Sequence, residues 1–207
     1  MTITGMVKKP KHLHEIEFSC RDSILIDSSV CAEQGLYKGM ELTETQIAEI
    51  SKKSDYARAV SRSIWYIERG DITKKALTDK LKRAGFSADA TEYAVNRLIS
   101  LDLLNDQAFA ARLAERLIGG NVSRREAFSK MLLKGFCKED IENALNNTEC
   151  CEEAQIKAVI EKKYKNKLDT PENIRKVYAA LIRRGFGFSG VRAVLKNYSE
   201  ELMFSEE

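Results

Sequence analysis

Pairs of basic residues stand where two predicted helices begin, and they are the side chains best suited to binding chemistry. Lys74 and Lys75 open one helix, and Arg124 and Arg125 open another. The helix dipole disfavours a cation in the first turn by a few tenths to about 1 kcal/mol. Glu126 is the only nearby acidic residue that would offset this cost, and it does so for the two arginines alone. An anionic partner would explain all four cations, because helix N-termini and flanking cations both attract anions. We predict that these four residues contact a partner.

Four further cations lie inside or at the end of another predicted helix, which ends at Gly185. They are Arg175, Lys176, Arg183 and Arg184. Cations near a helix C-terminus are stabilised by the dipole, so Arg183 and Arg184 have an equally good interpretation as solvated charges. We place all four in the predicted partner-binding set, after the two pairs.

The chain lacks the sequence patterns of common catalytic sites. It has no Gly-rich phosphate loop, no H-E-x-x-H and no G-x-S-x-G motif. Its two histidines, His12 and His14, lie on an N-terminal segment that we expect to be mobile. The 5 cysteines, including adjacent Cys150 and Cys151, show no metal-binding spacing and are typical of free thiols in a reducing cytoplasm. We predict a cytoplasmic protein that is not an enzyme, with no catalytic residue, metal or cofactor.

Charge and hydropathy narrow the class of protein further. The net charge of +3 is uneven, because the first quarter of the chain is acidic and the remainder is basic. This excess is too small to establish nucleic-acid binding by itself. No apolar stretch is long enough for a membrane span, and we expect no signal peptide.

A Gly-Phe pair recurs at a fixed step of 50 residues, at Gly85, Gly135 and Gly185. Each pair follows a basic, apolar helical run and precedes another helical run. A period of this size indicates a tandem array of one supersecondary unit. Glycine supplies the left-handed conformation that ends a helix, and the Phe, as in Phe186, packs back on the last turn. Arrays of this kind usually present binding surfaces.

The elements around these pairs predict a mainly α fold with a small β-containing N-terminal cap. Residues 15–20 alternate like a half-buried strand, and residues 23–27 are expected to form a second strand of the same hairpin. A capping box at 43–46 opens a helix that carries Ile47 and Ile50. We expect one helix per repeat at residues 56–67, 106–118 and 151–164, second helices ending at the glycines, and third helices at 88–100, 138–147 and 188–198. The predicted domains are the cap (1–54) and three-helix repeats at 55–104, 105–150 and 151–207, which together form an elongated, curved array.

Two groups of conspicuous residues have structural interpretations. One group indicates the start of a helix whose apolar residues face the core. It consists of Leu104, Asp106, Phe109 and Ala110. Trp65 and the Tyr that follows it lie beside apolar positions, which favours packing over base stacking.

These motifs together resemble the RecX family, regulators of the RecA recombinase. The resemblance runs from residue 35 to residue 195, and its most specific stretch is the Leu104, Asp106, Phe109 and Ala110 motif. It continues through residues 120–136 and 181–195. It implies a monomeric, non-enzymatic protein that lodges in a RecA filament on single-stranded DNA and mainly inhibits recombinase, ATPase and co-protease activity.

Two other functions stay open. Helix-turn-helix-like units would bind DNA directly through phosphate contacts, with a steep salt dependence. A generic helical-repeat scaffold would bind some other protein. A weak direct DNA contact is compatible with the RecA function as well.

Overall fold

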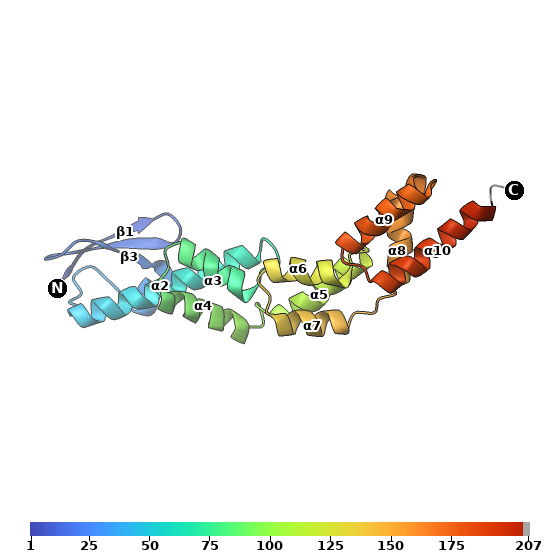
Figure 1. The fold of residues 1–207 in the computed structure, drawn as a ribbon. Coiled ribbons are helices and arrows are strands. Elements are labelled where there is room, and N and C mark those ends of the chain that lie inside the picture. The colour runs from blue at the N-terminus through green and yellow to red at the C-terminus, as the bar shows by residue number, and fades with distance from the viewer. Residues whose placement is uncertain (205–207) are drawn as a thin grey trace. The chain divides into compact units, whose positions relative to one another are not determined.

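The computed structural model describes the backbone of residues 1–204 and the side chains of residues 1–198. It contains two compact units, Met1–Asn105 and Asp106–Glu207. The elements are helical except for one small N-terminal sheet (Figure 1). The predicted fold class, mainly α with an N-terminal β-containing part, is therefore confirmed.

The N-terminal sheet has three antiparallel strands in the order β1 (Ile3–Lys9), β2 (Leu13–Phe18) and β3 (Ile24–Asp27). The prediction of a mobile N-terminal segment is wrong, because β1 pairs along β2. The alternation in β1 is weak, and its partner is a neighbouring strand that a local pattern does not reveal. His14 lies in β2, and its Nδ1 atom is 3.0 Å from the Ser28 hydroxyl.

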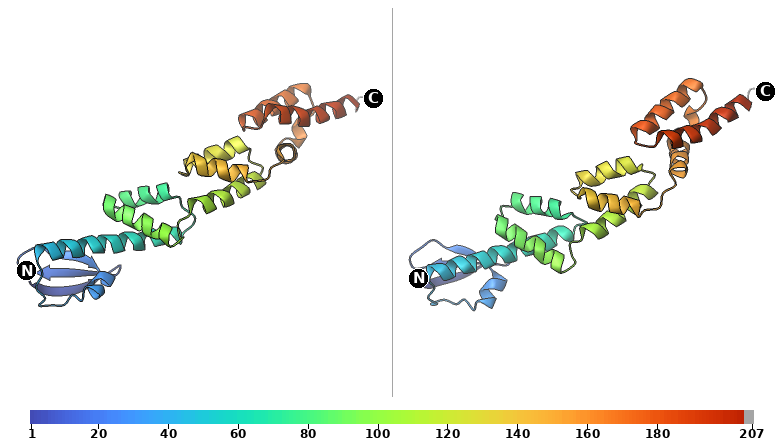
Figure 2. Two further views of the ribbon diagram at one scale, coloured as in Figure 1. Left: turned by 90° about the horizontal axis from the view of Figure 1, so that it is seen from below. Right: turned by 60° about the horizontal axis from the view of Figure 1, so that its bottom comes forward.

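A single long helix, α2 (Glu44–Ile67), connects the sheet to the rest of the first unit. The predicted capping box is present, with Thr43 and Gln46 bonded to each other's backbone N–H. The predicted boundary at residue 54 falls inside this helix, which Figure 2 shows as continuous. Ser54 is buried there and accepts a hydrogen bond from the backbone N–H of Asp27 at 2.8 Å. No Gly or Pro interrupts the helix, so the cap and the first repeat share it.

The two ends of α2 contribute to two different cores. The N-terminal half packs with the sheet and α1 (Ser28–Glu33), and Ile47 and Ile50 are buried there. The C-terminal half packs with α3 (Lys74–Arg83) and α4 (Ala88–Ser100) around Leu77 and Leu81. These three helices form the first three-helix repeat.

The second unit contains two further three-helix repeats, each with its own core. The first comprises α5 (Asp106–Gly119), α6 (Arg124–Leu133) and α7 (Lys138–Asn146) around Met131 and Ile141. The second comprises α8 (Glu152–Lys163), a 3₁₀ turn η1 (Lys165–Lys167), α9 (Pro171–Arg183) and α10 (Phe188–Phe204). Its core lies around Leu181 and Val191.

The middle helix of every repeat ends in the same way. Gly85, Gly135 and Gly185 have φ values of 89°, 95° and 87°. The N–H of the following Phe donates to a carbonyl five residues earlier, which is the Schellman motif. The donor and acceptor pairs are Phe86 and Leu81, Phe136 and Met131, and Phe186 and Leu181. The repeating Gly-Phe pairs therefore end helices, as predicted.

Candidate partner-binding surface

The helices that carry the predicted cations begin at side-chain N-caps. The hydroxyls of Thr73, Ser123 and Thr170 each accept a hydrogen bond from the backbone N–H three residues later, at 3.2–3.3 Å. A satisfied N-cap fixes where the first turn starts. Lys74 and Lys75 therefore occupy the first turn of α3, and both are exposed.

The start of α6 meets the end of α9 at the buried N-cap residue Ser123, whereas Arg124 and Arg125 stay exposed. Ser123 is 1% exposed, and its hydroxyl donates to the carbonyl oxygen of Arg184. Arg124 donates to the Thr148 carbonyl at 3.0 Å, in the loop just after α7. A hydrogen bond from a charged donor stabilises the cation at this position. The sequence shows no such internal benefit for Arg124, whereas the structure provides one.

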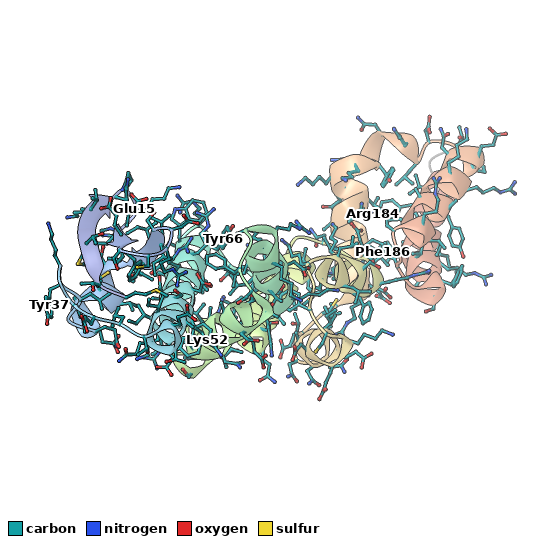
Figure 3. All side chains as sticks on the ribbon, turned by 90° about the vertical axis from the view of Figure 1, so that its left-hand side faces the viewer. Glu15, Tyr37, Lys52, Tyr66, Arg184 and Phe186 are labelled. Atoms are coloured by element: carbon teal, nitrogen blue, oxygen red, sulfur yellow. The ribbon has the colours of Figure 1, made fainter. Side chains whose placement is uncertain are left out.

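Arg184 belongs to the same joint between α6 and α9. Its side chain is 24% exposed, and its Nε lies 4.0 Å from a carboxylate oxygen of Glu126, which also pairs with Lys130 at 2.6 Å. The guanidinium also lies over the ring of Phe186, at 5.9 Å from the centroid (Figure 3). Among the four predicted cations of α9 and its C-cap, Arg184 therefore makes the most contacts within the protein.

A second hydrogen bond joins the two repeats of this unit. The amide of Gln155, at the start of α8, donates to the Ile118 carbonyl at 2.6 Å and accepts from the Cys150 thiol. Gln155 is only 7% exposed, so both of its polar atoms need such partners. Cys150 therefore takes part in the packing of this joint.

The other predicted cations of α9 face solvent. Arg175, Lys176 and Arg183 are exposed and form no ion pair in the part of the chain that the structure describes. Lys176 and Arg183 are seven residues apart and lie on one face of the helix. Arg175 lines an open hollow of about 410 Å³ between α9 and α10, together with Tyr178 and Arg192. The structure therefore places Lys176 and Arg183 on one exposed face of α9, and Arg175 on another face beside α10.

The residues of the family motif are structural in position. Leu104, Phe109 and Ala110 are buried, and the Phe109 ring lies 4.9 Å from that of Phe136. Asp106 is the first residue of α5. The motif therefore fixes the start and the inner face of α5, as its structural interpretation predicts.

The thiols of this protein are free, and two of them have a raised pKa. Burial raises the pKa of the Cys31 thiol. A hydrogen bond to the Asp140 carboxylate raises the pKa of the exposed Cys137 thiol. A thiol with a raised pKa is a weaker nucleophile and metal ligand at neutral pH. Among the described residues, no three His, Cys, Asp or Glu side chains are placed to hold a metal ion.

Sequence inspection missed a cluster of cations around Trp65. Trp65 is 37% exposed and so does not belong to a buried core, whereas the neighbouring Tyr66 packs against the core of the first repeat. Arg62 and Arg69 lie over the Trp65 ring, at 4.3 and 3.3 Å from the centroid. Their positions, three residues before and four after Trp65, are the signal in the sequence that could have revealed the cluster.

The fold defines a class of protein built from three-helix repeats with exposed cations. Within residues 1–204, none of the helices combines the length and apolar character needed to cross a membrane. Comparison with known proteins refines this class.

Residues 152–195 match the family model described as RecX, third three-helix domain. The chain is 25% identical to regulatory protein RecX of Streptococcus uberis over 199 residues, which covers 94% of this chain and 76% of the relative. It is 27% identical to regulatory protein RecX of Caldanaerobacter subterraneus subsp. tengcongensis over 198 residues, covering 94% of this chain and 98% of the relative. The resemblance to the RecX family is thereby confirmed.

Solved structures agree with this fold. A crystal structure of regulatory protein RecX matches with a TM-score of 0.73 at 24% identity, covering 94% of this chain and 98% of that chain. RecX from Lactobacillus salivarius matches with a TM-score of 0.62 at 20% identity, covering 70% of this chain and 97% of that chain. At these identities the likeness concerns the fold alone.

Proposed function

We propose that this protein binds the RecA filament on single-stranded DNA and modulates, mainly inhibits, its recombinase, ATPase and co-protease activities. The observation that carries the proposal is the similarity to proteins named regulatory protein RecX over 94% of the chain. The proposal also holds that the protein is cytoplasmic and non-enzymatic.

Electrostatics supplies a physical basis for the binding. Exposed cations on successive repeats would make several weak, salt-screened contacts with a filament that repeats its own anionic groups. Lys75, Lys176 and Arg183 are the strongest candidates, because they are exposed. Arg124 and Arg125 are exposed as well, but they are secondary, since Arg124 already donates to the Thr148 carbonyl and Arg125 lies beside Gly185 at the end of α9. If the protein is an elongated, curved array, these contacts would span several RecA subunits.

A charge-reversal experiment tests this assignment. The variant Lys176→Glu/Arg183→Glu reverses two exposed cations on one face of α9. Its matched control, Lys162→Glu/Lys163→Glu, reverses two exposed cations at the end of α8 in the same unit. Co-sedimentation with RecA filaments assembled on long single-stranded DNA should weaken with the first variant and stay near wild type with the second. If the two variants co-sediment with the filament to the same extent, these cations of α9 do not form part of the interface.

The alternative function is direct DNA binding. The same co-sedimentation assay, carried out with DNA alone and no RecA, distinguishes it from filament binding. A protein that acts on the filament should co-sediment far less with naked duplex DNA at physiological salt. Equal recovery on naked duplex, with a steep loss as salt rises, would favour the DNA-binding function instead.

A further inference from the structure

Two adjacent thiols, which the proposed function does not use, lie in the link between α7 and α8 (Figure 1). Cys150 is half-buried and Cys151 is exposed. Both residues line an open hollow of about 670 Å³ at the joint between the last two repeats, and Gln155 lines it as well. The hollow therefore gives small molecules in solution access to this pair.

The two thiols differ in what holds them. The Cys150 thiol donates to the side-chain oxygen of Gln155 at 3.1 Å, and the amide nitrogen of Gln155 donates to the Ile118 carbonyl at 2.6 Å. Cys151 stands at the N-cap position of α8, and its side chain makes no capping hydrogen bond. The sulfur of Cys151 is thus accessible to a reagent, whereas a change at Cys150 acts through Gln155 on the end of α5.

The other thiols of the chain lack this arrangement. Cys31 is buried. A hydrogen bond to the Asp140 carboxylate raises the pKa of the Cys137 thiol, which slows its oxidation because the thiolate is the reacting form. Cys20 and Cys137 are exposed, but neither has a cysteine beside it in the sequence. Only at residues 150 and 151 does the sequence place a second thiol next to one that has been oxidised.

We propose that Cys150 and Cys151 form a redox switch, which a peroxide closes into a disulfide and a thiol reductant opens. The Cys151 thiolate attacks one peroxide oxygen, which breaks the O–O bond and leaves a sulfenic acid and a hydroxide ion. The Cys150 sulfur then attacks the sulfenic sulfur, and the sulfenic oxygen leaves as water with the Cys150 proton. The two thiols together lose two electrons and two protons, and hydrogen peroxide becomes two molecules of water.

The position of the pair makes this disulfide easy to reverse. Consecutive Cα atoms are about 3.8 Å apart across a trans peptide bond, below the range of roughly 4.4–6.8 Å that is usual for disulfide-linked residues. The bond therefore forms only with some movement of the backbone, and the pair lies outside the regular turns of α7 and α8. Strained disulfides of this kind are readily reduced.

Closing the switch should loosen the joint between the two repeats. Oxidation removes the Cys150 proton, so the buried amide of Gln155 loses a hydrogen-bond donor. The Ile118 carbonyl, to which Gln155 donates, also accepts from the backbone N–H of Asn121 at 3.0 Å. Amide hydrogen exchange at Asn121 therefore reports on the joint. The switch requires no RecA and stands independently of the proposed function.

Mass spectrometry of the full chain tests the chemistry. The variant Cys20→Ser/Cys137→Ser removes the other exposed thiols and should leave the switch intact. After treatment with hydrogen peroxide and then with N-ethylmaleimide, the peptide that contains both remaining exposed-site cysteines, Cys150 and Cys151, should carry no maleimide. Its mass should be lower than that of the reduced peptide by two hydrogen atoms. Dithiothreitol should restore both thiols.

Hydrogen exchange on the same samples tests the coupling to the joint. Peroxide should raise the exchange rate at Asn121 roughly fivefold to 150-fold, the effect of losing one buried hydrogen bond, and leave Phe86 in the first unit unchanged. Cys150→Ser keeps a hydroxyl donor near Gln155 but cannot form the disulfide. In this variant dimedone should label a persistent sulfenic acid at Cys151, and peroxide should leave exchange at Asn121 unchanged. Circular dichroism verifies that every variant is folded.

Several outcomes would overturn the inference. They are full maleimide labelling of both cysteines after peroxide, a disulfide that links two chains in non-reducing electrophoresis, and an internal disulfide with unchanged exchange at Asn121. Direct passage of Cys151 to sulfinic acid would also overturn it, because that product is not reversed by a thiol. None of these measurements involves RecA, so a failure here is distinguishable from a failure of the proposed function.

Discussion

Substituting alanine at two equivalent glycines tests the joint between α6 and α9. Gly85 and Gly185 end their helices with φ values of 89° and 87°, so Ala suffers the same backbone strain at both positions. That strain costs about 1–2 kcal/mol for a residue with a Cβ. A Cβ at Gly85 would meet nothing within 4 Å. Gly85→Ala should therefore lower the free energy of unfolding by the strain alone.

Gly185→Ala adds a steric clash to the same strain. Its Cβ would lie 2.8 Å from the Cβ of Arg125 and 3.0 Å from the hydroxyl of Ser123. The Arg125 Cβ is fixed to the backbone and the buried Ser123 hydroxyl is held by two hydrogen bonds, so the start of α6 has to shift. Overpacking of this kind costs roughly 1–3 kcal/mol. The expected total is about 2–5 kcal/mol for Gly185→Ala, against about 1–2 kcal/mol for Gly85→Ala.

Urea unfolding followed by far-UV circular dichroism measures both values, with the midpoint and slope compared for each variant. Amide hydrogen exchange locates the effect, because Gly185→Ala should reduce protection at the start of α6 while Gly85→Ala leaves that region unchanged. Destabilisation that agrees within about 0.5 kcal/mol for the two variants would refute the joint as described.

Substitutions at three further positions probe other parts of the structure. Thr43→Ala removes the N-cap of α2 and should cost about 1 kcal/mol in urea unfolding, whereas Thr43→Ser should retain most of the stability. Phe136→Ala empties a buried position beside Phe109 and should cost roughly 3–5 kcal/mol by the same measurement; a loss below about 1 kcal/mol would contradict the packing. A hydrogen bond from Lys9 lowers the pKa of Glu15, so its stabilising effect is present above the ordinary Glu value of about 4.3 and is lost as pH falls through the folded value. Thermal unfolding of Glu15→Gln and wild type should thus differ at neutral pH and converge in acid, and a constant difference would argue against the ion pair.

Features fixed by local chemistry could be predicted from the sequence. The N-caps at Thr73, Ser123 and Thr170 and the three Gly-Phe helix ends depend on residues within one turn of each other. The sequence shows these residues directly, so the start and end of each middle helix follow from them. The same holds for the capping box at Thr43.

Features that depend on distant partners could not be predicted. Strand β1 is stabilised by pairing with β2, and the continuity of α2 past Ser54 depends on a bond from the backbone of Asp27. Within the candidate site, Arg124 finds its acceptor in the loop after α7. The exposure of Trp65 depends on which side of α2 the cores occupy. The side chains that face solvent are therefore known only once the repeats are packed.

The central claim is that this protein restrains a RecA filament, and RecA ATP hydrolysis measures this most directly. Purified protein is titrated into RecA, single-stranded DNA and ATP, and the rate of hydrolysis is followed. The rate should fall progressively as the protein is added, and Lys176→Glu/Arg183→Glu should require a higher concentration for the same inhibition. A rate that stays constant up to stoichiometric protein would contradict the claim.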